Sequence, residues 1–493
     1  MFKTVTPESV GLKSKYIKEF ISKIEKRNIH MHSILLCRGY DIFGEFYWAP
    51  FDKDFLHRMY SQTKSYVAIA IGLLVEEGKL SLNDKIADFF PEKIDTPLSE
   101  SLKDQTVENM LMMSTSGYGE SWFSSQYRDR CWIYFNQRKE SVRYPGTIWE
   151  YDSQGSQVLC CLVEKIAGKP MLEYLREKIL NHLGTFKTAN ILKIPTGESW
   201  GDSALLCTSR DMLSFGRFVM NYGTWDGKRL MNEEFLRKAT SKLTDNREIA
   251  FKDVLAHGYG YLIWRTEKNG FAFVGMGDQL TICLPDYDLI FVCTADNQGS
   301  QYSRELLLSY FFDLIVDNIE DSPLPEDEES YKDMLEATSN LSLYSLKGQD
   351  YSPWQEKING KKYVFPENEL GLKNLTFKFE NDGGVLYYEN ENGQLELPFK
   401  LNENYFGKFP ELGYSDGVGR TRTTNGFKYD CATSGAWLCD NKIMLFAQII
   451  DKYFGNVSMC FGFNNNHITV TFYKTAEDFL WNYNGQAYGK TEI

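Results

Sequence analysis

The chain has 493 residues, a formal net charge of −13, and 43% hydrophobic and 25% charged residues. This length exceeds one compact domain, and the composition is that of an ordinary globular protein with large cores. The acidic balance excludes a broad phosphate-binding surface, because nucleic-acid binders carry clustered Lys and Arg, so we expect no nucleic-acid partner.

The cysteines and the first residues indicate the compartment. The ten cysteines show no metal-ligand spacing and lie mostly in apolar segments, as small core side chains do in reducing surroundings. The first twenty residues contain no apolar stretch of the secretory kind, and no segment approaches about 18 uninterrupted apolar residues. We therefore expect a cytoplasmic protein with no membrane span, no metal and no organic cofactor.

The first 320 residues alternate between helical and strand patterns. An amphipathic helix is predicted within residues 1–30, where apolar side chains recur at helical spacing. Residues 32–48 indicate two strands around a turn, and a long apolar helix follows and ends near Gly78. Further helices are expected at 105–118, 153–167, 203–222 and 302–317, and antiparallel strands at 257–296.

The remainder of the chain has a different pattern. We expect a first domain over residues 1–320, an acidic, proline-containing linker at 321–345, and a second domain at 346–493. Short β-rich runs separated by turn residues fill this last part. They predict an antiparallel barrel or sandwich, of which a lipocalin-like barrel is one form.

Ser61 and Lys64 stand three residues apart, directly before the long apolar helix. On a helix these positions share a face, so the two side chains can meet. A serine hydroxyl is a weak nucleophile until a base takes its proton, and a lysine serves as that base only where its pKa falls towards neutrality. A buried helix start favours this shift and also offers backbone N–H groups to an oxyanion. The alternative is an ordinary serine at a helix start.

The surrounding stretches resemble the serine β-lactamase and penicillin-binding-protein superfamily, in particular its class C and esterase-like branch. Four stretches carry the resemblance in the family's order, and it covers roughly residues 5–316. They are "YSQTKSY" with its apolar helix (60–78), "MLMMSTSGYG" (110–119), "PGTIWEYDSQGSQVLCCLVEKIAGKPMLEYLREKIL" (145–180) and "SALLCTSRDMLSFGRFVMNYGTWDGKRLM" (203–231).

The resemblance implies an α+β fold, with an antiparallel sheet flanked by helices and a helical subdomain. It also implies that Tyr151, in Tyr-Asp-Ser, is a proton carrier beside Ser61 and Lys64. Ser153 stands where the family usually has Asn, and by resemblance it would contact the substrate.

The family's third motif, Lys/His-Thr/Ser-Gly, is missing. Its place is taken by a stretch that resembles the esterase and amide-hydrolase variant "G.GGQ", with Asp278 where Gly is usual. By resemblance the backbone N–H groups of Ser61 and Met276 form the oxyanion hole. The other substrate-contacting residues implied here are Gly275, Gly277 and Gln279.

These features predict a serine hydrolase that acts through an acyl-enzyme on a small acyl substrate. Loss of the third motif favours an esterase, amidase or D-aminopeptidase-like enzyme over a true β-lactamase. A non-catalytic binding or scaffold protein that retains the fold is the alternative from another class, and a homo-oligomer is open to either. The pattern G-x-S-x-G at 197–201 is a weaker candidate nucleophile, because a proline-containing loop surrounds it in place of a strand and a helix.

Overall fold

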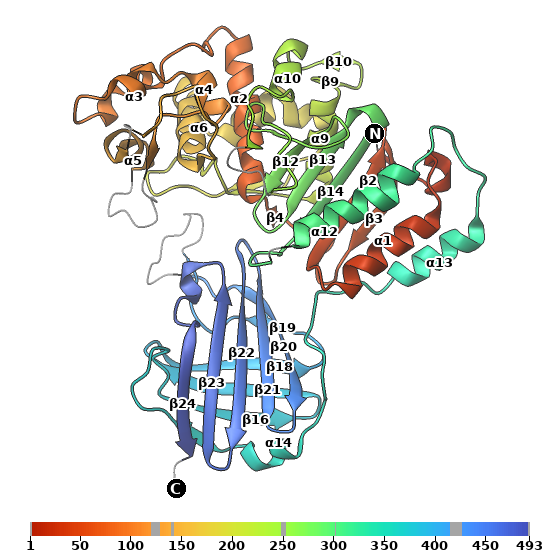
Figure 1. Cartoon of the computed structure of the whole chain (residues 1–493), viewed down its shortest axis with the longest axis vertical. Coiled ribbons are helices and arrows are strands. Elements are labelled where there is room, and N and C mark those ends of the chain that lie inside the picture. Colours follow the sequence, from red (N-terminus) through yellow and green to blue (C-terminus); the bar gives the residue numbers. More distant parts are fainter. Residues whose placement is uncertain are drawn as a thin grey trace. The chain divides into compact units, whose positions relative to one another are not determined.

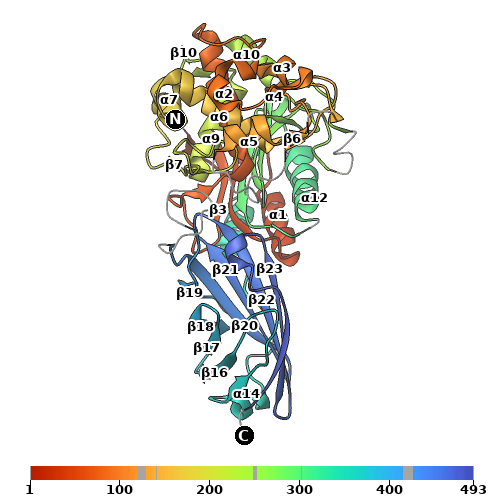
Figure 2. The same ribbon diagram turned by 90° about the vertical axis from the view of Figure 1, so that its left-hand side faces the viewer.

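The computed structural model describes residues 2–119, 129–139, 142–247, 253–300, 302–414 and 426–491. These form two compact units that meet in the sequence between Ser342 and Leu343. The first unit holds a sheet covered by helices, and the second is a β-barrel (Figures 1 and 2).

The sheet of the first unit has seven strands. In spatial order these are β1 (Lys3–Thr4), β3 (Asp41–Tyr47), β2 (Met31–Arg38), β14 (Leu289–Ala295), β13 (Gln279–Leu284), β12 (Phe271–Gly275) and β11 (Trp264–Arg265). Neighbouring strands are antiparallel except β1 and β3, which are parallel. Six of the strands form the antiparallel sheet predicted from the sequence, and the two-residue β1 adds one parallel pair that makes the sheet mixed.

One face of the sheet packs against three helices, α1 (Ser14–Lys26), α12 (Ser303–Tyr310) and α13 (Glu328–Thr338) (Figure 1). Alternate strand residues such as Ile34 and Leu36 enter this core, as the two-residue period of a strand requires. The apolar stripe of α1 meets them, so the first helix predicted from the sequence is confirmed.

The opposite face packs against α9 (Ser209–Met220), which approaches the strands closely. A side chain at Gly216 would place its Cβ 2.7 Å from Cγ2 of Thr281, so only glycine allows this approach. The ring of Phe215 stacks on Tyr66 of α2 (Thr63–Glu76), with centroids 3.8 Å apart. The helix that follows Ser61 is thereby fixed to the sheet through α9.

The other helices of this unit form a subdomain around α2, and α6 packs directly against it. They are α3 (Glu100–Asp104), α4 (Val107–Leu111), α5 (Arg130–Asn136), α6 (Ser153–Ala167), α7 (Met171–Leu175), α8 (Asn181–Leu183) and α10 (Glu233–Ala239).

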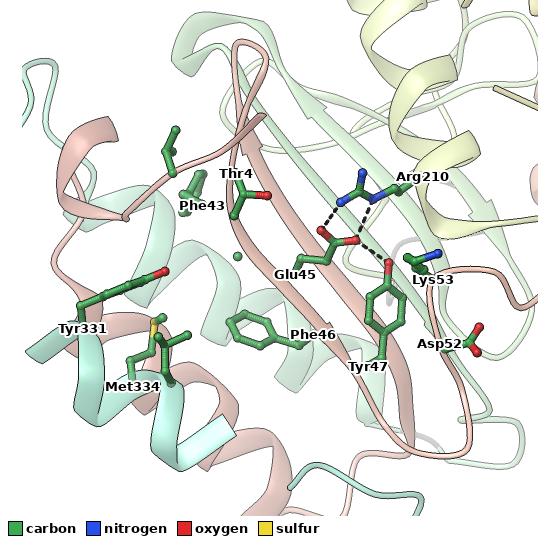
Figure 3. Close-up of a pocket in the computed structure, with 13 residues that line it drawn as sticks. Thr4, Phe43, Glu45, Phe46, Tyr47, Asp52, Lys53, Arg210, Tyr331 and Met334 are labelled. Atoms are coloured by element: carbon green, nitrogen blue, oxygen red, sulfur yellow. Dashed lines mark hydrogen bonds and ion pairs between the residues drawn. The ribbon is translucent and has the colours of Figure 1, made fainter. Parts of the chain in front are cut away.

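A groove of about 430 Å³ lies along β3, with α13 beside it (Figure 3). Its polar part is a bidentate ion pair in which Arg210 of α9 donates to both carboxylate oxygens of Glu45, at 2.8 and 2.6 Å. The hydroxyl of Tyr47 also donates to Glu45, at 2.7 Å. These contacts tie the first turn of α9 to the outer part of the sheet.

The second unit is a closed barrel of nine strands. Around the ring these are β18 (Gly393–Leu401), β17 (Gly383–Asn390), β16 (Asn374–Glu380), β15 (Lys362–Val364), β24 (Gly485–Thr491), β23 (His467–Thr475), β22 (Phe454–Asn464), β21 (Lys442–Ile450) and β20 (Asp430–Cys439). A parallel pairing of β18 with β20 closes the ring, and β19 (Tyr405–Lys408) pairs with β20 as an extra strand. The predicted β domain is confirmed as a barrel, but a lipocalin barrel has eight strands.

Aromatic rings pack together inside the barrel. Phe377 is fully buried, and its ring centroid lies 4.9 Å from that of Phe461 and 6.3 Å from that of Phe399. Strand β16 alternates between buried and more exposed residues along this region, as one wall of a barrel does.

The domain limits at residues 320 and 346 remain a prediction. Between these two positions in the sequence, the structure has a helix that was not predicted. Residues 328–338 form α13, whose Met334 belongs to the core under the sheet. The acidic composition of this segment had indicated a linker. Among the described residues no helix combines the length and the hydropathy that crossing a membrane requires.

Replacing Phe377 with Ala should lower the free energy of unfolding of the barrel by about 3–5 kcal/mol, because it removes a buried ring and leaves a cavity. Urea unfolding of the full chain, followed by circular dichroism, measures this change. Tyr473→Ala on β23 is the matched control, because this ring is 61% exposed and its loss should cost less than about 0.5 kcal/mol. Equal shifts in the two variants would contradict a packed barrel interior.

Candidate active site

Ser61 lies in a 3₁₀ turn, Tyr60–Gln62, that leads directly into α2. The residue before it, Tyr60, has a φ of +46°, a left-handed conformation that costs free energy for a side chain of this size. The Thr63 hydroxyl donates to the Tyr60 carbonyl at 2.7 Å and holds this bend. The helix behind it is buried on all sides from Thr63 to Leu74, so it positions Ser61 rigidly.

Lys64 reaches back from the first turn of α2 to Ser61. Its Nζ donates to Ser61 Oγ at 2.8 Å and to the backbone carbonyl of Asp202 at 2.6 Å. Lys64 is 1% exposed, whereas Ser61 is half-buried. The structure therefore brings together the serine and lysine that the sequence singled out, with the serine on the accessible side.

Tyr151 lies beside this pair. The Lys64 Nζ is 5.1 Å from the centroid of the Tyr151 ring. The phenol ring also stacks on Trp264 of β11, with centroids 5.8 Å apart and planes 25° from parallel. The Tyr151 ring is thus in contact with both Lys64 and Trp264. The contact with Trp264 could not be predicted from the sequence.

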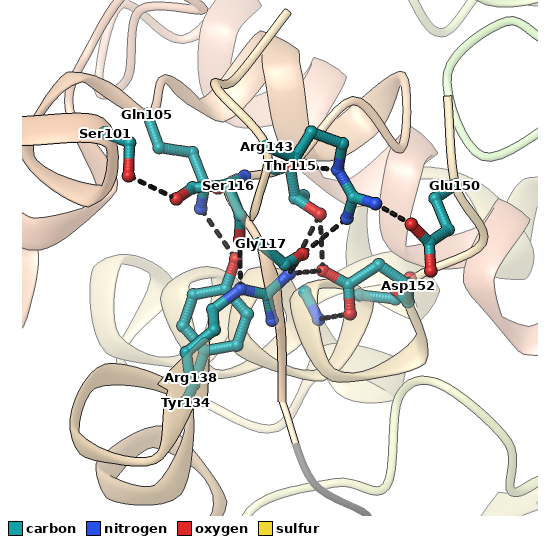
Figure 4. A network of polar contacts seen from close by, with 12 residues as sticks. Ser101, Gln105, Thr115, Ser116, Gly117, Tyr134, Arg138, Arg143, Glu150 and Asp152 are labelled. Atoms are coloured by element: carbon teal, nitrogen blue, oxygen red, sulfur yellow. Dashed lines mark hydrogen bonds and ion pairs between the residues drawn. The ribbon is translucent and has the colours of Figure 1, made fainter. Parts of the chain in front are cut away.

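The carboxylate of Asp152, the residue after Tyr151, anchors the start of α6 in a polar network (Figure 4). Its Oδ1 accepts the backbone N–H of Gly155 at 3.0 Å, and its Oδ2 accepts the Thr115 hydroxyl at 2.7 Å and the Arg138 guanidinium at 2.6 Å. Burial alone would raise the pKa of Asp152, but the Arg138 charge and these hydrogen bonds outweigh it and lower the pKa. Asp152 is therefore held ionised in the interior.

The end of β12 lies against the segment that carries Ser61. The Cβ of any side chain at Gly275 would come within 2.1 Å of the Met59 carbonyl oxygen, so glycine is required for this approach. The Gln62 side chain donates to the Phe273 carbonyl at 3.1 Å and ties the strand to the same turn. Met276, which follows the strand, is 46% exposed.

Two other predicted contact residues differ in their surroundings. Ser153 begins α6 and is half-buried near Tyr151. Gln279 is fully buried, and its Nε2 donates to the carbonyls of Met276 at 3.0 Å and Ala295 at 2.7 Å. The expected contact of Gln279 with substrate is thus corrected to support of the turn from behind, because its amide faces the backbone.

The loop at 197–201 does not present its serine. Ser199 is buried, and its carbonyl accepts the Gln157 side chain at 2.8 Å. The same loop continues to Asp202, the backbone partner of Lys64. Among the residues that the structure describes, no group of three or more His, Cys, Asp and Glu side chains could hold a metal ion.

The model of the beta-lactamase family matches residues 33–308, which is more than half of the chain. The chain belongs to the beta-lactamase family. The residues matched include Ser61, Lys64, Tyr151 and the whole of β12, so the site described above lies inside the family domain. The predicted resemblance and the predicted fold of the first unit are confirmed.

Three similar proteins are informative. The 6-aminohexanoate-dimer hydrolase of Paenarthrobacter ureafaciens is 24% identical over 216 residues, which cover 41% of this chain and 55% of that protein. A putative 6-aminohexanoate-dimer hydrolase from Bacillus anthracis has a TM-score of 0.53 at 18% identity and covers 66% of this chain and 88% of its own. The octameric penicillin-binding protein homologue from Pyrococcus abyssi has a TM-score of 0.50 at 16% identity and covers 96% and 99%. The chain spans less than two thirds of the curated relatives it matches.

Replacing Arg138 with Gln should lower the free energy of unfolding by about 3–5 kcal/mol, because it leaves the buried Asp152 carboxylate without its guanidinium partner. Thermal unfolding monitored by calorimetry measures the effect. Lys165→Gln removes an exposed pair with Glu92 and should cost less than about 1 kcal/mol. A loss at Arg138 no larger than at Lys165 would show that the network does not stabilise this region.

A buried histidine pair precedes the Ser61 turn. His57 Nδ1 lies 3.1 Å from the Arg58 carbonyl, to which its N–H donates, and its Nε2 accepts from His32 Nδ1 at 2.8 Å. Burial lowers the pKa of His57 to about 3 and the pKa of His32 well below its usual range. The folded protein therefore keeps both rings neutral at pH values where the unfolded chain binds protons.

The free energy of unfolding should consequently fall by up to about 1.4 kcal/mol per pH unit and per histidine as the pH is lowered from about 6.5 towards 3. The reason is that the unfolded state binds more protons in this range. In His57→Gln the melting temperature should fall less steeply between pH 6.5 and 4.5 than in the wild type. His182→Gln, an exposed histidine on α8, should keep the wild-type slope. Parallel slopes for all three proteins would refute the neutral pair.

Proposed function

We propose that the chain is a serine hydrolase that forms an acyl-enzyme on Ser61 from a small ester or amide. The observation that carries this proposal is the 2.8 Å contact between Lys64 Nζ and Ser61 Oγ, beside the Tyr151 ring. A hydroxyl that must become a nucleophile needs a proton acceptor at this distance. Hydrolase relatives within the same family support the reaction class.

In the proposed reaction Ser61 Oγ attacks the carbonyl carbon of the substrate. Its proton passes to Lys64 Nζ, and Tyr151 assists in passing it to the leaving group, which departs as an alcohol or amine. Water then attacks the acyl-enzyme by the reverse route and releases the acid. The Asp202 carbonyl holds Nζ in place throughout, because it accepts a second hydrogen bond from the same nitrogen.

The negative charge on the tetrahedral intermediate needs donors that are already in position. We assign them to the backbone N–H groups of Ser61 and Met276. The close approach of Gly275 to Met59 supports this pairing, because it brings the end of β12 against the strand-to-helix turn that carries Ser61.

The substrate class follows from the strand end. Residues 275–279 are Gly-Met-Gly-Asp-Gln, so this stretch supplies no Lys or His to bind a substrate carboxylate. The relative from Paenarthrobacter is named for hydrolysis of a 6-aminohexanoate dimer. We therefore expect short esters and linear amides to be turned over faster than β-lactams. A homo-oligomer and a cytoplasmic location remain predictions.

Ser61→Ala should reduce hydrolysis of p-nitrophenyl acetate by at least about 1000-fold and abolish labelling by a fluorophosphonate, because the attacking oxygen is lost. Ser199→Ala is the matched control, since this serine lies in the competing G-x-S-x-G pattern and is buried; its turnover should equal that of the wild type. Nitrocefin measured in parallel tests the substrate class.

The outcome also separates an enzyme from a scaffold that retains the fold. Mass spectrometry after incubation with the fluorophosphonate should find one adduct, on the peptide that contains Ser61. Wild-type protein that gives neither turnover nor an adduct would favour the scaffold. Turnover that survives in Ser61→Ala and is lost in Ser199→Ala would move the nucleophile to the other loop.

A further inference from the structure

The turn that follows β12 contains a charged residue in an unusual backbone conformation. Gly275 pairs with Gln279 to close the hairpin, which leaves Met276, Gly277 and Asp278 as the turn. Asp278 has a φ of +70°, in the left-handed region that favours glycine. Asp tolerates this region better than most residues do, but the conformation still costs free energy. Something in the structure must offset that cost.

The carboxylate of Asp278 is held from both sides by the start of α12. Arg304 Nε donates to Oδ1 at 2.9 Å, and the Ser303 hydroxyl donates to Oδ2 at 3.1 Å. Asp278 is 3% exposed, so these two contacts act in a poorly solvated environment. Arg304 also lies 3.5 Å from the carboxylate of Asp253, which fixes its other end.

We call the contacts of Ser303 and Arg304 with the Asp278 carboxylate the clamp. Helix α12, which carries Ser303 and Arg304, is rigidly packed. Leu307, three residues after Arg304, is fully buried in the core between the sheet and its helices. The clamp therefore connects the turn to a helix that cannot move independently of the sheet. The turn carbonyls are held as well, since Asn297 N–H donates to Gly277 at 3.2 Å and the Gln279 amide donates to Met276 at 3.0 Å.

We propose that the Asp278–Arg304 pair is a positioning device that keeps the backbone N–H of Met276 directed at the carbonyl oxygen of the acyl substrate. This inference rests on the proposed function, because it assigns a role within that reaction. Neither side chain touches the reacting atoms. Their effect passes through the turn, in which Asp278 follows the exposed Met276 by two residues.

A purely structural pair would have a different signature. Removing it would lower stability and leave the rate of the chemical step unchanged. A positioning pair contributes to the transition state more than to substrate binding, since the charge on the oxygen develops only there. Its loss should therefore reduce kcat while KM changes little.

The test compares Asp278→Gly, Arg304→Gln, the double variant and Arg304→Lys in the full chain, with p-nitrophenyl acetate as substrate. Glycine fits a φ of +70°, so Asp278→Gly removes the carboxylate without straining the turn. We expect kcat to fall about 10- to 100-fold in Asp278→Gly and Arg304→Gln, with KM within about twofold. The double variant should be no worse than either single one, because the two side chains act as a unit. Arg304→Lys should recover part of kcat.

Glu45→Gln with Arg210→Gln is the matched control, because it removes another carboxylate–guanidinium pair, here a bidentate one, that ties a strand of the same sheet to a helix (Figure 3). It should lower the melting temperature and leave kcat unchanged. The rate of fluorophosphonate labelling at Ser61 should fall in parallel with kcat in the Asp278 and Arg304 variants only.

Each outcome has one meaning. Unchanged kcat in Asp278→Gly, or an equal fall of kcat in the control, overturns the positioning role while Ser61-dependent turnover of the wild type keeps the proposed function. Wild-type protein without Ser61-dependent turnover overturns both. If Asp278→Gly fails to fold, the Arg304 variants decide. The proposal then requires that kcat in Arg304→Lys lies between the values of Arg304→Gln and the wild type. Wild-type kcat in Arg304→Gln, with a reduced kcat in Arg304→Lys, contradicts it.

Discussion

The site depends on one buried amine. Lys64 Nζ lies between an alcohol oxygen three residues earlier and a backbone carbonyl 138 residues later, at 2.8 and 2.6 Å. The carbonyl oxygen only accepts a hydrogen bond and has no proton to give, whereas the Ser61 hydroxyl carries one. The amine is thus fixed by the carbonyl and directed at the Ser61 oxygen, which is the nucleophile in the proposed reaction. The apolar helix behind it buries the amine, and Ser61 stays on the accessible side.

Three separate parts of the fold meet around the Ser61 turn. This turn and the first turn of α2 supply Ser61 and Lys64, the segment before α6 supplies Tyr151, and the sheet supplies the end of β12. Each part has its own anchor: α9 stacks on Tyr66, the Asp152–Arg138 network caps α6, and Gln62 ties the Ser61 turn to β12. The geometry of the site therefore reflects packing of the whole first unit more than any local motif.

How much of this the sequence could predict depended on the range of the interactions. Helix α6 was predicted with its observed limits, because Gly168 and Pro170 mark its end locally. Residues 257–296 were predicted as antiparallel strands, but Gly258 and Leu262 have positive φ values and the first strand of this stretch is only Trp264–Arg265. Strand β20, rich in small residues, gave no β signal and is a strand because its neighbours pair with it.

Whether a site residue could be predicted also depended on how far apart in sequence its contacts lie. Ser61 and Lys64 were found because their contact is local, and Tyr151 because the family resemblance supplied it. The Asp202 carbonyl, the Trp264 ring and the Arg138 guanidinium were missed, because each is distant in sequence and a backbone carbonyl leaves no trace in the residue pattern. Gln279 was assigned to substrate because a motif gives identity and spacing, and neither tells which way an amide points.

Two carboxylate–guanidinium pairs with buried carboxylates, Asp152–Arg138 and Asp278–Arg304, lie next to residues of the candidate site. Taking both charges out of water offsets most of the attraction between them, so such a pair adds little stability over an apolar contact of the same size. What it adds is direction, because a planar guanidinium donates to a carboxylate in few orientations. Asp152 adjoins Tyr151, and Asp278 lies two residues from Met276. In both places the pair holds a short segment next to a residue to which the proposed reaction assigns a role.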